Sequence, residues 1–144
     1  MNVLVTGGAS GLGGAITSRL ATVKEDTVFF SFHESVDKAR KIESLYPNCK
    51  GIKCDFKNSL DIESVMKLIE DVDIDVLINN AFATRITRQH FHKTDVSVFT
   101  DNFHFNVIPV IRITQRAILH FRKKKFGNII SVISSAIVGN PPIG

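Results

Sequence analysis

The chain has 144 residues, of which 44% are hydrophobic and 22% charged, with a formal net charge of +4 at pH 7. This length allows one hydrophobic core but not two ordinary domains, and the composition excludes a collagen-like or disordered chain. No apolar run approaches the ~20 residues of a membrane helix, and the N-terminus lacks the features of a signal peptide, so we expect a cytoplasmic protein without membrane partners.

Short apolar runs alternate with amphipathic segments through the first half of the chain. Residues 2–6 are expected to form a buried strand that leads through glycines into a helix. Residues 27–32 (TVFFSF) are typical of a second strand, and Ser35 is a suitable N-cap for the helix that follows. A third strand is expected over residues 50–54, and Ser59 begins a third helix. The segments therefore follow a strand–helix repeat.

The second half continues the same alternation. A fourth strand is expected over residues 75–78, followed by a loop rich in Thr, Arg and His. A long helix is predicted over residues 95–124, with Gly127 as its stop, and a fifth strand over residues 128–133 (NIISVI). Strands separated by single helices indicate parallel pairing, and near-continuous apolar strands indicate a sheet covered on both faces. The predicted fold class is α/β, a doubly wound parallel sheet.

Three polar clusters suggest other classes of protein, and each has a plainer explanation. The basic run over residues 122–125 suggests nucleic acid, but cations are favoured at a helix C-terminus and no aromatic residues interleave with them. Cys49 and Cys54 form no CxxC pair and are expected to be reduced thiols. His90 and His92 form an HxH pair without partners at metal-ligand spacing. Neither nucleic acid nor a metal is expected.

The glycine-rich segment over residues 6–13 (TGGASGLG) lies between the first strand and the first helix. Glycines permit a tight turn and a close approach of the backbone to a pyrophosphate, and the helix N-terminus offers unpaired N–H groups to the anion. The alternative is a glycine-rich turn without a ligand. The position of the loop favours nucleotide binding.

The spacing of this loop is TGxxxGxG, with glycines at positions 7, 11 and 13. It resembles the glycine motif of the short-chain dehydrogenase/reductase family. The resemblance implies a single NAD(P)-binding Rossmann-type domain over residues 1–144, with five of the usual seven strands and an incomplete C-terminal end. It implies cofactor contacts in this loop from Thr6, Gly7, Ser10, Gly11, Leu12 and Gly13.

Further positions match the family in the same order. Asp55, after the third strand, resembles the acidic residue that meets the adenine amino group, and Asn80 and Ala81 resemble part of the NNAG element. Asn106 and Ser134 resemble the catalytic Asn and Ser. Each also has a plainer reading: Asp55 as a turn residue, Ser134 as the end of a strand. Asn79, just before Asn80, is expected at least partly to tie neighbouring strands together.

The resemblance implies an oxidoreductase that transfers a hydride between a nicotinamide cofactor and a carbonyl or alcohol substrate. Hydride transfer to a carbonyl builds negative charge on its oxygen, which Ser134 would hold by a hydrogen bond. Asn106 is expected to hold a water of the proton relay. Pro109 adds physical support, because a proline inside a helix removes one hydrogen bond and makes the backbone irregular beside Asn106. The alternative is a plain kink that affects packing only.

Two departures from the family pattern matter. The family's general acid is a Tyr 13 residues after its Ser, which falls three positions beyond Gly144, and Tyr46 cannot take that place. The segment is therefore expected to be truncated and inactive by itself, and the alternative function is a non-catalytic dinucleotide-binding or interaction module. Phe82 replaces the last glycine of the NNAG element, where it would crowd the cofactor or form part of a substrate wall.

The segment after the second strand bears on the choice between NADP and NAD. NAD-preferring proteins place an acid at the end of this strand, and residues 32–35 (FHES) have no Asp there. Glu34 would repel a 2′-phosphate, whereas His33 and Ser35 are able to hydrogen-bond it. We expect both as cofactor-binding residues, with NADP preferred and NAD as the alternative.

Two further contacts are expected. Arg85, Arg88 and His90 lie in the loop where the family contacts substrate, and they would face an acidic ligand. The long helix over residues 95–124 carries more apolar residues than one face needs, and in the family the equivalent helix lies in the subunit interface. A homodimer or homotetramer through this helix is therefore predicted.

Overall fold

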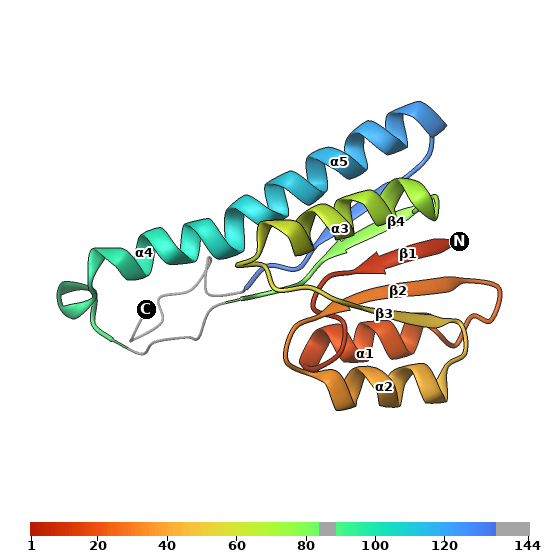
Figure 1. The fold of residues 1–144 in the computed structure, drawn as a ribbon, viewed down its shortest axis with the longest axis horizontal. Helices are drawn as coiled ribbons and strands as arrows, with labels where there is room; N and C mark the ends of the chain where they lie inside the picture. The colour runs from red at the N-terminus through yellow and green to blue at the C-terminus, as the bar shows by residue number, and fades with distance from the viewer. Residues whose placement is uncertain (84–88, 135–144) are drawn as a thin grey trace.

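The chain folds around one parallel β-sheet (Figure 1). The computed structural model describes residues 1–83 and 89–134, and within them five strands run in the order β3-β2-β1-β4-β5. The strands are β1 (Asn2–Val5), β2 (Thr27–Phe32), β3 (Cys49–Lys53), β4 (Val76–Asn79) and β5 (Asn128–Ser131). All neighbouring strands pair in parallel. The predicted doubly wound sheet is confirmed.

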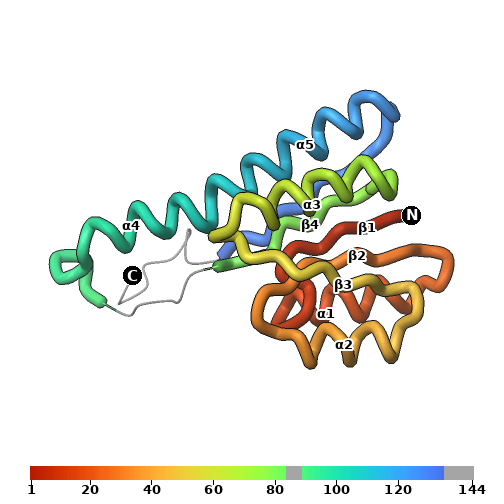
Figure 2. Tube along the Cα trace, in the orientation of Figure 1, coloured from red at the N-terminus to blue at the C-terminus, as the bar shows by residue number. Residues whose placement is uncertain are grey.

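Helices cover the two faces of the sheet. Figures 1 and 2 show α1 (Gly11–Leu20) and α2 (Val36–Leu45) on one face, and α3 (Ser59–Asp71) and α5 (Ile108–Lys124) on the other. Side chains alternate along β1, so Leu4 packs in the α3/α5 core while Val3 and Val5 pack in the α1/α2 core. Each face thus has an apolar core of its own.

The order of the strands reverses beside β1. From β1 the chain winds outward to β2 and then β3, and it returns to the other side of β1 for β4 and β5. In open α/β sheets a ligand binds outside the carboxyl ends of the strands at such a reversal. A ligand site is therefore expected at the carboxyl ends of β1 and β4.

The long helix predicted over residues 95–124 contains one irregular turn. It is built from α4 (Val96–Asn102), a π-helical turn (Phe103–Val107) and α5, after a short 3-10 turn (Phe91–Lys93). The N–H of Ile108 donates to the carbonyl of Phe103, five residues back. Pro109 follows directly and has no N–H to continue a regular ladder. The irregular backbone predicted beside Asn106 is confirmed.

The end of α5 differs from the prediction that Gly127 stops it. Lys125 takes a left-handed φ of 56°, and its N–H and that of Phe126 both return to the carbonyl of Phe121. Gly127 comes two residues after Lys125, where a Cβ would overlap the Phe121 ring. Positive φ is uncommon for lysine, so the sequence pattern favoured the glycine. The glycine instead lets the chain pass close to the helix.

The expectation that both faces of the whole sheet are covered is wrong at the edge strand β5. This strand ends two residues earlier than predicted, and all its residues are exposed. Ile129 pairs with Leu77 and Ile130 with Ile78, so the two isoleucines face opposite sides of the sheet, with exposed fractions of 38% and 51%. An apolar pattern reports the character of a strand, not whether a layer packs on it.

Candidate functional site

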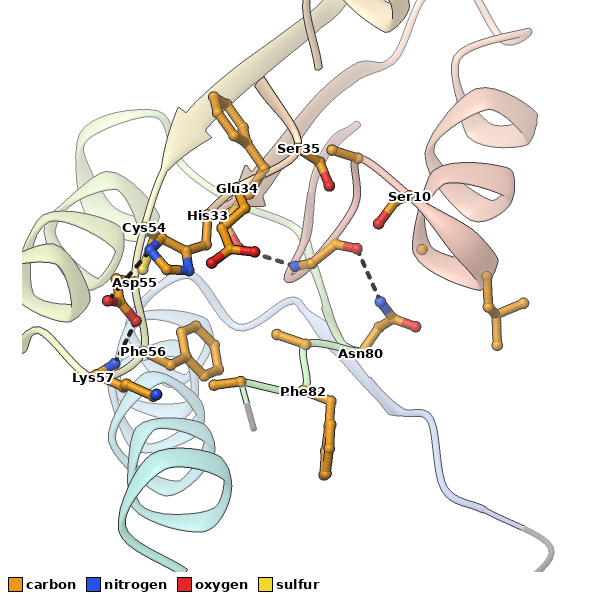
Figure 3. Close-up of a pocket in the computed structure, with 18 residues that line it drawn as sticks. Ser10, His33, Glu34, Ser35, Cys54, Asp55, Phe56, Lys57, Asn80 and Phe82 are labelled. Atoms are coloured by element: carbon orange, nitrogen blue, oxygen red, sulfur yellow. Dashed lines mark hydrogen bonds and ion pairs between the residues drawn. The ribbon is translucent and has the colours of Figure 1, made fainter. Parts of the chain in front are cut away.

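A cleft of about 650 Å³ opens at the carboxyl edge of the sheet (Figure 3). Its walls come from the segments after β1, β2, β3 and β4, so it spans the reversal of strand order. Most of the predicted cofactor-binding residues line it: Gly7, Ser10, Leu12, Gly13, His33, Ser35, Asp55, Asn80 and Ala81. Thr6 and Gly11 lie outside the lining. The prediction did not include these lining residues: Ala9, Ser31, Phe32, Cys54, Phe56, Lys57 and Ala83.

The loop after β1 is compact because its glycines let backbone segments meet. Gly7 has a φ of 66°, and a Cβ there would lie 2.8 Å from the Cα of Ala81. A Cβ on Gly13 would overlap the carbonyl oxygen of Gly7 and the amide nitrogen of Asn80. Gly11 has free space around it but a φ of 54°, so its backbone conformation is what requires glycine. The TGxxxGxG spacing thus has a physical basis here.

The N-terminus of α1 opens beside this loop. α1 begins at Gly11, and Ser10 occupies its N-cap without a side-chain cap hydrogen bond. The first N–H groups of a helix have no intrahelical partners, and the helix dipole is positive at this end. An anion such as a pyrophosphate is favoured in this position. The loop and the helix together form a cradle suited to phosphate.

Thr6 lies beneath the cleft surface rather than on it. It is fully buried, and its Oγ1 accepts hydrogen bonds from the N–H of Asn80 at 2.9 Å and of Ala81 at 3.1 Å. Asn80 Nδ2 in turn donates to the carbonyls of Thr6 at 3.0 Å and Gly7 at 3.2 Å. These bonds join the segments after β1 and β4. Contact between Thr6 and a cofactor stays a prediction.

The neighbouring Asn79 joins the sheet to a helix. Its Nδ2 donates to Oγ1 of Thr114 in α5 at 3.0 Å, and its side chain is buried. The sequence predicted a tie between strands, whereas the side chain reaches across to the covering helix. The strands are tied at this point by backbone instead, because the N–H of Val132 donates to the carbonyl of Asn79 at 2.9 Å.

The segments after β2 and β3 meet at one end of the cleft. Nε2 of His33 lies 3.4 Å from Oδ2 of Asp55, and Oδ1 of Asp55 accepts the N–H of Lys57 at 2.9 Å (Figure 3). On the β2 side, Oγ of Ser31 accepts the N–H of Gly7 at 3.0 Å. A serine inside the apolar run TVFFSF was the available signal for Ser31. No such signal indicated Lys57, because the group that contacts Asp55 is the backbone N–H of Lys57.

Both cysteines are free and buried, as predicted for reduced thiols. Cys54 lines the cleft, but burial, together with the carboxylates of Asp61 and Asp55, raises its pKa to about 12. Burial and the nearby Glu43 raise the pKa of Cys49 to about 11. A thiol must ionise to act as a nucleophile, so Cys54 contributes shape to the cleft rather than reactivity.

Asn106 reaches the margin of the cleft from the π-helical turn. Its Oδ1 accepts the N–H of Ala83, a lining residue, at 2.6 Å, and its Nδ2 donates to Oδ1 of Asn102 at 3.3 Å. Ser134 was predicted to end β5, but the strand ends at Ser131, so Ser134 stands three residues beyond it in an exposed position. Ser134 is not among the lining residues. The catalytic roles of Asn106 and Ser134 stay predictions.

The remaining predicted positions lie around the loop after β4. Phe82 lines the cleft with 59% of its surface exposed. Arg85 and Arg88 lie outside the described residues. The rings of His90 and His92 stack with centroids 5.8 Å apart. Across residues 1–83 and 89–134, no group of three or more His, Cys, Asp or Glu side chains is placed to hold a metal, and no helix there has the length and apolar character to span a membrane.

Comparison with known proteins places this arrangement in a family. The protein-family model for short chain dehydrogenases matches residues 1–142. The chain belongs to the short-chain dehydrogenase family. The short-chain dehydrogenase relatives include farnesol dehydrogenase of Aedes aegypti, 32% identical over 93% of this chain and 56% of that protein. The 3-oxoacyl-acyl-carrier-protein reductase of Vibrio harveyi is 32% identical over 94% and 54%. The chain thus spans about half the length of these relatives.

Solved short-chain dehydrogenases share the fold. A double mutant of the short-chain dehydrogenase/reductase of Serratia marcescens aligns with a TM-score of 0.83 at 25% identity, over 99% of this chain and 59% of that one. A short-chain dehydrogenase from Sphingobium yanoikuyae in complex with NADPH gives 0.79 at 21% identity, over 94% and 54%. At that identity the second likeness shows the fold alone.

Proposed function

We propose that the chain is the cofactor-binding part of an NAD(P)-dependent oxidoreductase that moves a hydride between a nicotinamide and a carbonyl or alcohol substrate. The observation that carries the proposal is the glycine cradle at the start of α1. A Cβ on Gly7 would meet the backbone of Ala81, and a Cβ on Gly13 would meet the carbonyl of Gly7, so these glycines let the loop fold tightly beside the open N-terminus of α1. The residues present therefore fit a dinucleotide.

Each part of the cleft suits one part of such a cofactor. The pyrophosphate would lie against Gly7, Ser10 and the N-terminus of α1. The adenosine end would lie toward His33 and Asp55, because the end of the second strand of a Rossmann sheet meets the ribose. The nicotinamide end would then lie toward the segment after β4. When bound, the cofactor supplies or accepts the hydride.

The carbonyl chemistry is proposed for residues at the nicotinamide end. A hydrogen bond from Ser134 would stabilise negative charge on the carbonyl oxygen. Asn106 would hold a water for the proton relay, and the π-helical turn around it supports this, since such turns leave backbone groups outside the regular ladder. Tyr46 is no candidate for the general acid, because it packs against the α1/α2 core. The proton donor is proposed to be the Tyr that the family supplies.

NADP is proposed as the preferred cofactor, with NAD as the alternative. Residues 32–35 contain no Asp to hold two ribose hydroxyls, and His33 and Ser35 both line the cleft. Two of the structural relatives are described as a complex with NADPH and as an NADPH-dependent reductase. Glu34 opposes this preference, because its charge repels a 2′-phosphate.

The substrate is proposed to be a small carbonyl or alcohol compound, and the protein a cytoplasmic homodimer or homotetramer. The relatives are named for farnesol and for a 3-oxoacyl group, which share only the alcohol or ketone function. Association through the long helix is supported by apolar side chains that α4, the π-helical turn and α5 expose: Phe99, Phe103, Val107, Ile111, Ile118 and Leu119.

Titration with NADPH and NADH tests the proposal directly. The chain contains no Trp, so the fluorescence of a bound reduced nicotinamide is measured without tryptophan emission. We expect enhanced emission that saturates, with NADPH binding the tighter. Failure of both cofactors to bind would overturn the proposal. Binding without turnover of any carbonyl compound, in a protein that contains the family's Tyr, would instead favour the non-catalytic module.

A further inference from the structure

A contact between a histidine and a carboxylate joins the carboxyl ends of β2 and β3 inside the cleft. The two strands pair in parallel through Phe32 and Lys53, so the residues just after them emerge side by side. His33 follows the first and Asp55 the second, and Nε2 of His33 lies 3.4 Å from Oδ2 of Asp55. Both side chains line the cleft (Figure 3). The pair therefore borders any molecule bound there.

Asp55 is the fixed member of this pair. Its Oδ1 accepts the N–H of Lys57 at 2.9 Å, and its own N–H donates to Oδ2 of Asp61 in α3 at 2.8 Å. The Asp55 side chain is 28% exposed, against 48% for His33. The N–H of Lys57 thus orients the carboxylate, Asp61 of α3 anchors the backbone of Asp55, and the second carboxylate oxygen is directed to the more exposed imidazole.

His33 lies just after β2, where Rossmann proteins contact the 2′ substituent of the cofactor's ribose. In a Rossmann sheet the residues at the end of the second strand contact the 2′ position of the adenosine ribose. Residues 32–35 contain no Arg or Lys, and Glu34 adds a negative charge. His33 is therefore the side chain in this segment able to become a cation. An imidazolium donates from both ring nitrogens, so it is able to bind Asp55 with one and a second anion with the other.

We propose that Asp55 is a positioning residue that holds His33 toward the 2′-phosphate of an NADP-type cofactor, so that Asp55 and the 2′-phosphate are coupled through His33. The inference rests on the proposed function, because it requires a dinucleotide in the cleft. It makes a prediction opposite to that of simple charge repulsion. If Asp55 acted only by charge repulsion, removing its carboxylate would strengthen the preference for NADP+. If Asp55 positions His33, removing the carboxylate weakens that preference.

The test is a cycle of dissociation constants for NADP+ and NAD+, measured by calorimetry at about pH 6, where an ordinary histidine is mostly protonated. The proteins are the wild type, Asp55→Asn, His33→Ala and the double variant. We expect Asp55→Asn to lower the preference for NADP+ over NAD+ about fivefold. In the His33→Ala background the same substitution is expected to leave this preference unchanged or to raise it. An unchanged or raised preference in Asp55→Asn alone, or an equal fall in both backgrounds, overturns the proposal.

Glu34→Gln is the matched control. It removes a carboxylate that lines the same cleft and forms no ion pair within residues 1–83 and 89–134. Repulsion is then its main effect, so we expect the preference for NADP+ to rise whether or not His33 is present. If Asp55→Asn does not fold, Asp55→Ser replaces it, since a serine oxygen is still able to accept the N–H of Lys57.

The outcomes separate this inference from the proposed function. If wild type binds neither dinucleotide, both fail. If it binds both and the His33-dependent coupling is absent, the proposed function stands and the positioning role of Asp55 fails. Thermal unfolding of each variant shows whether it is folded. Because the His33 side chain is exposed, we expect His33→Ala to unfold at the wild-type temperature.

Discussion

The backbone N–H of Ala83 donates a hydrogen bond of 2.6 Å to Oδ1 of Asn106. Ala83 lines the cleft after β4, and Asn106 belongs to the π-helical turn between α4 and α5. The contact joins the margin of the candidate site to the irregular part of the long helix. It gives Asn106 a structural role that is separate from its proposed catalytic one.

Replacing Asn106 by Leu is expected to lower the free energy of unfolding by about 1–2 kcal/mol. Leucine has a similar size but leaves the part-buried N–H of Ala83 without this acceptor. Urea unfolding followed by circular dichroism measures the loss. Asn102→Ala is the control, since it removes a neighbouring asparagine and keeps the acceptor on Asn106. Equal losses in the two variants would contradict a specific role for the bond to Ala83.

Gly13→Ala is expected to weaken NADPH binding more than about tenfold and to lower the free energy of unfolding by about 1–3 kcal/mol. The new Cβ would overlap the carbonyl oxygen of Gly7 and the Asn80 amide, so the glycine loop must shift. Fluorescence titration and urea unfolding report the two effects.

Gly14→Ala is the matched control for this glycine. Its Cβ would lie 3.2 Å from the carbonyl carbon of Ala9, which is tight but not overlapping, and alanine favours a helix over glycine by about 1 kcal/mol. We expect near-wild-type stability and binding. The cradle interpretation fails if Gly13→Ala binds NADPH as well as Gly14→Ala does.

The parts of the site that were predictable are those with a local cause. A glycine loop between a strand and a helix has one geometry that suits its spacing, so positions 7, 11 and 13 were readable from sequence. The irregular helix was predictable because Pro109 lacks an N–H. His33 was identified because it follows the second strand, and Asp55 because it matches a family position after the third.

The parts that were missed depend on contacts between distant segments. The bond from Ala83 to Asn106 and the pair of His33 with Asp55 require the register of strands and helices, which no local pattern contains. The exposed edge of β5 was missed for the same reason, because its apolar residues resemble those of the covered strands. Lys125 in a left-handed conformation ran against the propensity of its residue type.

The proposed homodimer or homotetramer is tested by Ile111→Lys, which is expected to shift the molecular mass in solution toward that of the monomer. Ile111 is exposed on α5, in line with other exposed apolar residues of the long helix. A charge buried between two such helices would lack a partner. Light scattering after gel filtration measures the mass. Leu60→Lys on α3 makes the same change at another exposed apolar position, so an equal effect there would count against the long helix as the interface.

A basic side chain at the end of α5 holds two carboxylates of the segment before β4. Nζ of Lys124 lies 2.6 Å from Oδ1 of Asp75 and 2.7 Å from Oδ1 of Asp73. Burial alone raises the pKa of Asp75, but hydrogen bonds from Lys124 and from the N–H of Asn2 outweigh it and hold that pKa below its ordinary value. Burial alone lowers the pKa of Lys124, but its hydrogen bonds with Asp73 and Asp75 raise that pKa overall.

These directions fix the pH range in which the cluster stabilises the fold. A carboxyl group whose pKa is lowered on folding contributes above its unfolded pKa, about 3.9, and the contribution is lost as the pH falls through the folded value. A lysine whose pKa is raised contributes below its unfolded pKa, about 10.4, and loses the contribution as the pH rises through the folded value. The cluster therefore contributes fully at neutral pH.

Lys124→Met is accordingly expected to lower the free energy of unfolding at pH 7 by about 1 kcal/mol while keeping the apolar stem of the side chain. The difference from wild type should shrink as the pH falls from about 4 to about 2, because the carboxyl groups then become protonated in both proteins. Urea unfolding at a series of pH values measures it. Lys123→Met, at an exposed neighbouring position, is expected to change stability by less than about 0.5 kcal/mol. A difference between Lys124→Met and wild type that stayed constant down to pH 2 would show that the carboxylates of Asp73 and Asp75 are not its cause.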